Sequence, residues 1–208
     1  MQTSSNVTTI LFTDIESSTR LWEQHRERMS TALAGHDALA REVVEDNKGV
    51  VVKMIGDGMH AVFGDPLDAI RATVALQRAL SDPAVTDGVP LRIRCGLHLG
   101  IVETRDNDQF GITVNRAARI MGAAHGGQAL ISQAVFEVVR ENLPADVSLR
   151  DLGSVRLRGL GNPEHVYQLV HPDLRREFPA LRSLESAPNN LPHQVTSFIG
   201  RERVLAYA

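Results

Sequence analysis

A predicted β-hairpin at residues 50–63 constrains this chain more than any other stretch. Two apolar runs flank the sequence Gly-Asp-Gly. An Asp-Gly pair between hydrophobic runs is typical of a tight hairpin turn, because both central positions tolerate positive φ. The pattern places Lys53 on a strand and Asp57 in the turn. By itself it indicates only a turn aspartate and an edge-strand lysine, so any function must be argued from other residues as well.

The composition indicates one globular domain of ordinary size with an appendage. Of 208 residues, 43% are hydrophobic and 23% are charged, and the formal net charge of −3 argues against general nucleic-acid or membrane-surface binding. The single cysteine, Cys95, lies in an apolar run and suits a buried thiol in a reducing compartment. The N-terminus lacks a signal-peptide pattern, and no run approaches the roughly 20 apolar residues of a membrane span. We therefore expect a soluble, cytoplasmic protein.

Hydrophobic periodicity predicts a fold of the α+β class. The order of elements favours a ferredoxin-like βαββαβ core, with an antiparallel-rich sheet, helices on one face and additional C-terminal αβ elements. A long helix is expected to break or bend at Gly35. The predicted strands are residues 7–13, 50–55, 59–63, 91–102, 128–131, 147–152 and 165–170; the predicted helices are 19–46, 66–81, 112–124 and 132–142, and a loop is predicted at 103–109.

Two aspartates form a candidate metal site. Asp14 ends the first predicted strand, and Asp57 lies at the tip of the hairpin. In a ferredoxin-like sheet these two strands can be neighbours, which brings the carboxylates to one edge. Adjacent carboxylates repel each other unless a cation lies between them, and a hard ion such as Mg²⁺ prefers oxygen ligands. A helix-capping aspartate beside a turn aspartate is the alternative interpretation.

The turn after the first strand is a candidate phosphate site. A free helix N-terminus there presents backbone N–H groups that favour an anion. The stretch lacks the glycines of a P-loop, so the inference from these residues alone is weak. The candidate residues are Ile15, Glu16, Ser17, Ser18 and Thr19.

A predicted helix carries an amide and a guanidinium four residues apart. Asn115 and Arg119 share one face of this helix, where together they suit a sugar and a phosphate. A solvated helix face is the alternative.

Four spaced motifs now indicate a family. They are Phe12-Thr13-Asp14-Ile15, Lys53-x-x-Gly56-Asp57-Gly58, Asp108-x-Phe110-Gly111 and Val114-Asn115-x-Ala117-Ala118-Arg119. In this order they resemble the catalytic domain of class III nucleotidyl cyclases, above all those of the actinobacterial, mycobacterial type. The resemblance runs from residue 7 to residue 170 and implies a catalytic domain over residues 1–170.

The resemblance implies a role for each polar residue. Asp14 and Asp57 match the aspartates that hold two divalent ions, Mg²⁺ or Mn²⁺, in each active site. Asn115 matches the asparagine that orients the ribose, and Arg119 matches the arginine that stabilises charge on the α-phosphate. Arg158 aligns with a triphosphate-contacting lysine, a departure that keeps the charge but changes the geometry. The implied reaction converts ATP to 3′,5′-cyclic AMP and pyrophosphate.

Lys53 and Asp108 align with the pair that selects the base. Lysine donates and ionised aspartate accepts, so the two complement the N1 acceptor and the N6 donor of adenine. Guanine reverses both positions, and a buried mismatch would cost several kcal/mol. ATP is therefore the expected substrate, and a guanylate cyclase is disfavoured. The Gly-Gly-acidic-acidic-Phe signature of diguanylate cyclases is absent.

The resemblance also implies a second copy of the chain. Lys53 and Asp57 are close in sequence yet should contact opposite ends of one nucleotide. The family resolves this with a head-to-tail homodimer that has two composite sites: one chain gives Asp14 and Asp57, and the other gives Lys53, Asp108, Asn115 and Arg119.

The chain after residue 170 differs in pattern. Residues 171–208 are expected to be a linker and the start of a further, ATPase-like regulatory domain, because residues 190–202 resemble the lead-in to such domains in bacterial transcriptional regulators. The alternative to an active cyclase is a catalytically weak or silent nucleotide-binding module that regulates the attached domain.

Overall fold

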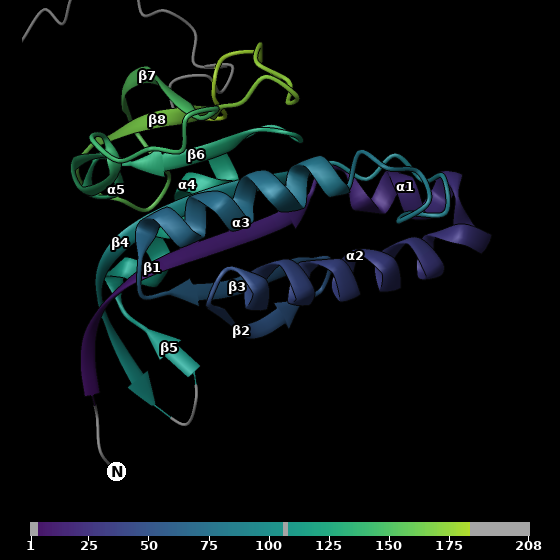
Figure 1. Cartoon of the computed structure of the whole chain (residues 1–208), viewed down its shortest axis with the longest axis horizontal. Coiled ribbons are helices and arrows are strands. Elements are labelled where there is room, and N and C mark those ends of the chain that lie inside the picture. The colour runs from purple at the N-terminus through teal and green to yellow at the C-terminus, as the bar shows by residue number, and fades with distance from the viewer. Residues whose placement is uncertain (1–3, 106–107, 184–208) are drawn as a thin grey trace, which may run out of the picture.

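The computed structural model describes residues 4–105 and 108–183, and for residues 4, 5, 104, 105 and 108 the backbone alone. The stretch at residues 190–202 that resembles an ATPase lead-in lies outside the described residues. Figure 1 shows the elements in chain order. They are β1 (Ser4–Ile15), α1 (Ser18–Gln24), α2 (Arg26–Asp46), β2 (Gly49–Ile55), β3 (Gly58–Phe63), α3 (Pro66–Ala79), β4 (Ile93–Arg105), β5 (Asp108–Phe110), α4 (Ile112–Ala123), β6 (Ala129–Ser132), α5 (Gln133–Val139), β7 (Ser148–Val155) and β8 (Glu164–Val170).

The described strands form one mostly antiparallel sheet. Its order is β2-β3-β1-β4-β6-β8-β7, and β5 pairs with β4 off this path. Every pairing is antiparallel except β4 with β6. The β2-β3-β1-β4 portion, with its two crossover helical segments, is the ferredoxin-like βαββαβ core. The predicted α+β class is confirmed.

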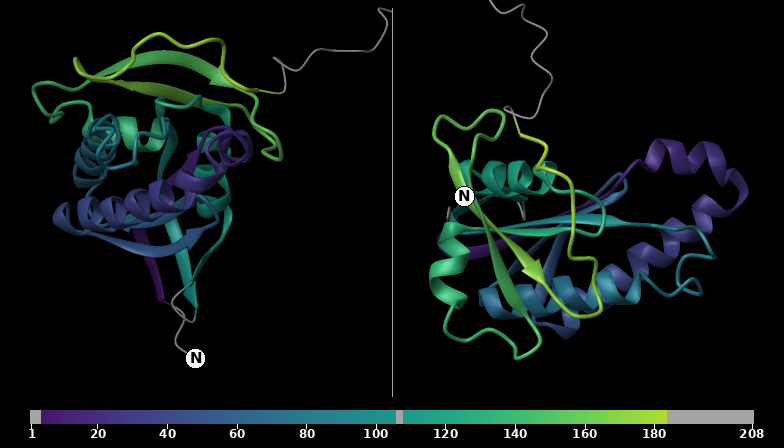
Figure 2. Two further views of the ribbon diagram at one scale, coloured as in Figure 1. Left: turned by 90° about the vertical axis from the view of Figure 1, so that its right-hand side faces the viewer. Right: turned by 90° about the horizontal axis from the view of Figure 1, so that it is seen from above.

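Helices α2 and α3 of the ferredoxin-like core lie on one face of the sheet, as expected, and the additional helix α4 lies on the opposite face. Alternate residues of β4 show why. Cys95 and Leu97 belong to the cluster that includes α2 and α3. A Cβ at Gly96 would lie 2.2 Å from the Met121 nitrogen, and one at Gly100 would lie 2.8 Å from Thr113 Oγ1, so both glycines let α4 lie directly on the opposite face. The right-hand view of Figure 2 shows α4 on one side of the strands and α2 and α3 on the other.

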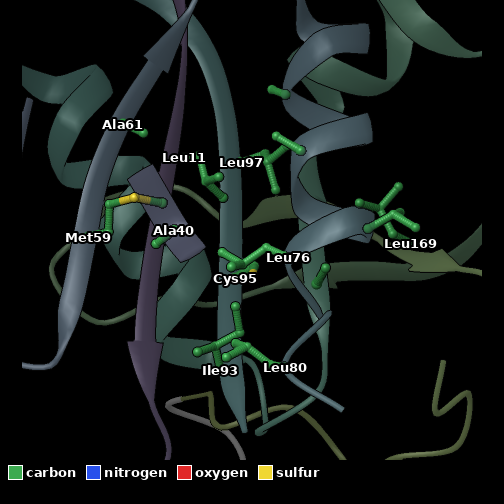
Figure 3. Packing of buried hydrophobic residues seen from close by; sticks show 14 of the residues in the cluster. Leu11, Ala40, Met59, Ala61, Leu76, Leu80, Ile93, Cys95, Leu97 and Leu169 are labelled. Carbon is green, nitrogen blue, oxygen red and sulfur yellow. The ribbon is translucent and has the colours of Figure 1, made fainter. Parts of the chain in front are cut away.

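The largest core cluster lies between the central strands and α2 and α3. Figure 3 shows Leu11, Ala61 and Leu97 on the strands facing Ala40 and Leu76 on the helices. These side chains are fully buried. The register Leu11↔Ala61 and Leu11↔Leu97 places all three strand residues on one row, and this row fixes which side of β1 faces the helices.

Two local predictions fail for identifiable reasons. The long helix breaks at His25, the C-cap of α1, and continues through Gly35. Gly35 is required for a close approach instead, because a Cβ there would lie 2.1 Å from the Val85 carbonyl oxygen. The predicted loop at residues 103–109 contains the end of β4 and the first two residues of β5, and the two strands pair through Glu103↔Phe110 and Thr104↔Gln109.

The described chain after β8 has no helix or strand. Residues 171–183 run back over the sheet, as the yellow trace in Figure 2 shows. Among the described helices, none is both long enough and apolar enough to cross a membrane.

Candidate active site

Strand pairing brings Asp14 and Asp57 together. Asp14 pairs with Gly58 across the β1–β3 ladder, and Asp57 directly precedes Gly58. A Cβ at Gly58 would lie 2.3 Å from the Thr13 carbonyl oxygen, so only glycine permits this approach of the two strands. Backbone register and one missing side chain therefore bring the two residues to the same end of neighbouring strands, and a shared metal site of their carboxylates stays a prediction.

The hairpin turn differs in detail from the predicted one. Ile55 pairs with Gly58, so the two turn residues are Gly56 and Asp57 rather than Asp57 and Gly58. Gly56 has φ +62°, whereas Asp57 keeps a negative φ. The expected turn with positive φ at both central residues is thus wrong, and a turn that needs glycine only at its first central position replaces it.

Asp57 carries an unsatisfied carboxylate oxygen. Its Oδ2 atom is buried and has no hydrogen-bond partner among the described residues. A buried polar atom without a partner costs roughly 1–3 kcal/mol, so native structures rarely leave one without a reason. A bound cation between Asp57 and Asp14 would satisfy it.

Arg94, which was not among the predicted site residues, also belongs to this site. Its Nε and Nη2 atoms both donate to Asp14 Oδ2, at 2.7 and 2.6 Å. The partners face each other across the β1–β4 ladder, and both side chains are about one-quarter exposed. No local sequence signal points to Arg94, because its importance depends on the cross-strand register that pairs it with Asp14. The guanidinium supplies positive charge beside the carboxylate pair.

The turn after β1 continues the site. Ile15 is buried at the strand end and Ser17 adopts a left-handed backbone with φ 58°. Ser17 is the N-cap of α1 but makes no side-chain capping bond. Glu16 does not face a free anion position, because its carboxylate bonds to Arg182 and to the Gly126 N–H. Of the five candidate phosphate residues, Ser17, Ser18 and Thr19 remain at least partly exposed.

Burial and hydrogen bonding act in opposite directions on Glu16. Burial raises the pKa of its carboxyl group, but the Gly126 N–H and the Arg182 guanidinium outweigh that effect and leave the pKa below its usual range. Glu16 is thus held as a carboxylate at neutral pH.

Asn115 and Arg119 lie on one exposed face of α4. Thr113 anchors the first turn of the helix by donating from Oγ1 to the Ile101 carbonyl, while Ala117 and Ile120 bury the opposite side. Asn115 and Arg119 are both exposed. A Cβ on Gly159 would lie 3.7 Å from Arg119 Nε. The loop that carries Arg158 therefore lies beside Arg119, which places three predicted site residues in one neighbourhood.

Strand pairing does not unite Lys53 and Asp108. Lys53 is exposed on β2, and Asp108 is the first residue of β5. In the sheet, β3, β1 and β4 lie between those two strands. Their joint action on one base stays a prediction.

The donor set of the carboxylate pair fits a hard divalent cation. Asp14 and Asp57 provide oxygen ligands alone, which Mg²⁺ and Mn²⁺ accept. Across the described part of the chain, no group of three or more His, Cys, Asp or Glu side chains is placed to hold a metal. Two carboxylates thus suit ions that also take ligands from a substrate phosphate and from water.

Comparison with known proteins identifies the family. The sequence profile described as "Adenylate and Guanylate cyclase catalytic domain" matches residues 1–171. An uncharacterised protein of Mycobacterium tuberculosis is 44% identical over 196 residues, covering 93% of this chain and 66% of the relative. The receptor-type adenylate cyclase GRESAG 4.1 of Trypanosoma brucei brucei is 30% identical over 217 residues, covering 84% of this chain and 17% of that protein.

A solved structure supports the same assignment. The adenylate cyclase structure from Trypanosoma brucei, in a monomeric state, superposes with a TM-score of 0.73 at 30% identity, covering 85% of this chain and 92% of that one. This chain belongs to the adenylate and guanylate cyclase catalytic domain family. It spans just under two thirds of the mycobacterial relative's length.

Proposed function

We propose that this protein is an adenylate cyclase that converts ATP to 3′,5′-cyclic AMP and pyrophosphate in a homodimer. The observation that carries the proposal is the paired Asp14 and Asp57, with the buried, unsatisfied Asp57 Oδ2. The adenylate cyclases among its relatives support the reaction class. Lys53 and Asp108 support ATP over GTP, since a donor and an acceptor complement the adenine edge.

Asp14 and Asp57 form one half of the proposed active site, the metal-side half-site, which activates the nucleophile and the leaving group. Two Mg²⁺ or Mn²⁺ ions held by Asp14 and Asp57 would make the ribose 3′-hydroxyl more acidic and offset charge on the triphosphate. Arg94, which pairs with Asp14 in this structure, is placed to turn its guanidinium to a triphosphate oxygen. Backbone N–H groups after Ser17 favour the same anion.

Asn115 and Arg119 form the other half of the proposed active site, the α4 half-site, which acts on the ribose and the α-phosphate. Asn115 orients the ribose, so that its 3′-oxygen lies in line with the α-phosphorus. As the new P–O bond forms and the bond to pyrophosphate breaks, Arg119 donates to the oxygens where charge develops. The 3′-hydroxyl proton passes to solvent, and Arg158 stabilises the departing pyrophosphate.

A second copy of the chain completes each site in this proposal. Asn115 and Arg119 lie on α4, across the sheet from α2 and α3, and both are exposed. Exposed apolar side chains support a partner surface nearby: Val7 and Ile101 are 64% and 63% exposed on paired strands, and Ile112 at the start of α4 is 69% exposed. Such a cluster marks an interaction surface.

A silent nucleotide-binding module is the second candidate. The observation that favours it is the Arg94–Asp14 pair, because a guanidinium there competes with a metal ion. A silent module would bind ATP and regulate an attached domain without turnover.

Product identification decides between the two. The purified protein is incubated with ATP or with GTP in the presence of Mn²⁺, and the products are identified by mass. We expect cyclic AMP from ATP and far less cyclic GMP from GTP. No cyclic nucleotide from either substrate, in protein shown to be dimeric, would overturn the enzyme proposal. A Lys53→Glu variant should shift the ratio toward GTP, since a carboxylate accepts from guanine N1–H.

A further inference from the structure

The segment after β8 lies outside the family match yet contacts the catalytic elements. The match ends at residue 171, and the structure describes the chain to residue 183. We name residues 172–183 the strap. Figure 2 shows it as the yellow trace over β7 and β8. The strap is therefore not part of the matched catalytic domain.

Polar contacts hold the strap to the sheet. Arg150 on β7 donates from both terminal nitrogens to the Glu177 carboxylate, at 2.7 and 3.1 Å. Gln168 on β8 donates to the Arg176 carbonyl at 2.8 Å. Exposed ion pairs contribute little individually, but these contacts fix the direction in which the strap runs.

The end of the strap docks on the loop after α4. His125 Nε2 lies 3.0 Å from the Ala180 carbonyl oxygen, and the Arg182 N–H donates to the Ala123 carbonyl at 3.0 Å. Leu181 packs against the apolar cluster that contains Ile120 and Ala123. The last turn of the helix that carries Asn115 and Arg119 thus anchors the strap.

From this anchor, Arg182 reaches the turn after β1. Its Nη2 atom donates to Glu16 Oε1. A Cβ on Gly126 would lie 2.6 Å from Glu16 Oε2, so the glycine makes room for this carboxylate beside the loop after α4. Glu16 N also donates to the Arg92 carbonyl at 2.9 Å. Glu16, two residues from Asp14, therefore lies between Arg182 of the strap and Gly126 of the loop after α4. We call this set of contacts the clasp.

The packing beneath the strap is incomplete. A cavity of about 400 Å³ lies against Asp173, Leu174 and Arg175, and another of about 530 Å³ lies against residues 178–181. Contacts across such hollows are few, and segments with few buried contacts open at low free-energy cost. Separation of the strap would expose Leu174 and Leu181, which pack against the apolar clusters, but would leave the strands and helices of the sheet paired.

We propose that Arg182 is a positioning residue: through Glu16 it holds the β1–α1 turn in the conformation that binds the triphosphate. Chain that follows residue 183 would then alter nucleotide binding by pulling the strap away. The effect on nucleotide binding rests on the proposed function, whereas the effect on the turn does not.

Hydrogen exchange of the full-length protein tests the clasp without any activity. We expect Arg182→Ala to speed amide exchange about two- to five-fold in peptides that cover residues 16–21 and 124–127, which is the range an exposed to half-buried ion pair supports. Arg176→Ala is the matched control. It removes the same charge from the same segment, at a side chain that donates to the Pro172 carbonyl within the strap, and it should leave both peptides unchanged.

Kinetics separate a positioning role from a structural one. Arg182→Ala should raise the KM for ATP about two- to five-fold with kcat and the unfolding temperature retained, and Arg182→Lys should restore part of the loss. Unchanged exchange at residues 16–21 in Arg182→Ala would overturn the clasp. Faster exchange with an unchanged KM would overturn its effect on nucleotide binding. If the wild-type protein makes no cyclic nucleotide, the proposed function fails, and the exchange experiment still tests the clasp.

Discussion

The two half-sites of this chain are built in different ways. Asp14 and Asp57 are held by a strand register, by a glycine that admits close approach, and by an arginine on the next strand. Asn115 and Arg119 project from an exposed helix face, and the Gly159 turn lies beside Arg119. Contacts within one chain hold the residues of the first half-site in position, whereas Asn115 and Arg119 of the second half-site are exposed to solvent.

This difference indicates how the residues of each half-site come to be held in the geometry that the reaction needs. The carboxylate pair must be rigid before metal arrives, because two adjacent negative charges repel each other. In the proposed mechanism Asn115 and Arg119 need no such rigidity before substrate binds, since they act on charge that appears only during the reaction. An exposed second half-site makes sense when a partner chain brings the nucleotide to it.

The largest expected effect tests the carboxylate half. Asp57→Ala should lower kcat/KM for ATP by at least about 10³-fold, equivalent to about 4 kcal/mol, because it removes a metal ligand. The fold should be retained, since the side chain makes no hydrogen bond through Oδ2. Asp46→Asn, at the exposed end of α2, is the control and should keep full activity. An Asp57→Ala variant of near wild-type rate would remove the metal site from the account.

The next effect tests the α4 half. Arg119→Ala should lower kcat about 10²- to 10³-fold with a smaller change in KM, because the guanidinium acts mainly on the transition state. Steady-state kinetics on folded protein measures this. Arg140→Ala, at the C-cap of α5, removes another exposed arginine and should leave activity unchanged. A rise in KM with kcat unchanged would assign Arg119 to ground-state binding instead.

A third prediction concerns the register that aligns the carboxylates. Gly58→Ala should reduce the free energy of unfolding by about 1–3 kcal/mol and lower Mn²⁺ affinity, since its Cβ would meet the Thr13 carbonyl oxygen at 2.3 Å. Gly64→Ala is the matched control, because a Cβ there meets nothing within 4 Å and Gly64 has no positive φ. Equal stability of the two variants in urea titrations would contradict the close-approach argument.

The smallest effect concerns the packing beneath α4. His98 is buried on β4, and burial followed by the nearby Arg116 lowers its pKa from 6.5 to about 4. The folded state therefore favours the neutral ring, so this group's stability contribution is complete above pH 6.5 and is lost as pH falls toward 4. At pH 5 the loss relative to pH 7 should be about 2 kcal/mol. Urea unfolding at both pH values should show a smaller loss in His98→Gln, and an identical loss would exclude His98 as the cause.

Much of the carboxylate half could be predicted from sequence. A strand ending at Asp14 and a hairpin bearing Asp57 are local patterns, and the βαββαβ order makes their strands neighbours. Arg94 was missed because its importance depends on the cross-strand register, which pairs it with Asp14. Register is set by the whole sheet and cannot be read from one strand.

Other features escaped prediction because they depend on tertiary contacts. Gly35 resembles a helix breaker, yet it lies inside α2 to admit the Val85 carbonyl. Gly96 and Gly100 place α4 on the second face of the sheet, and nothing local distinguishes them from flexible glycines. Polar residues at 103–109 resemble a loop, although pairing with β4 makes part of them a strand.

Mixing two inactive variants tests the shared active site most directly. Asp57→Ala and Arg119→Ala homodimers should each be inactive. After free subunit exchange of an equal mixture, half of the dimers pair one chain of each kind and hold one intact site of two. Activity should then recover to about a quarter of the wild-type level. No recovery, in a mixture whose subunit exchange has been verified, would contradict a site built from two chains.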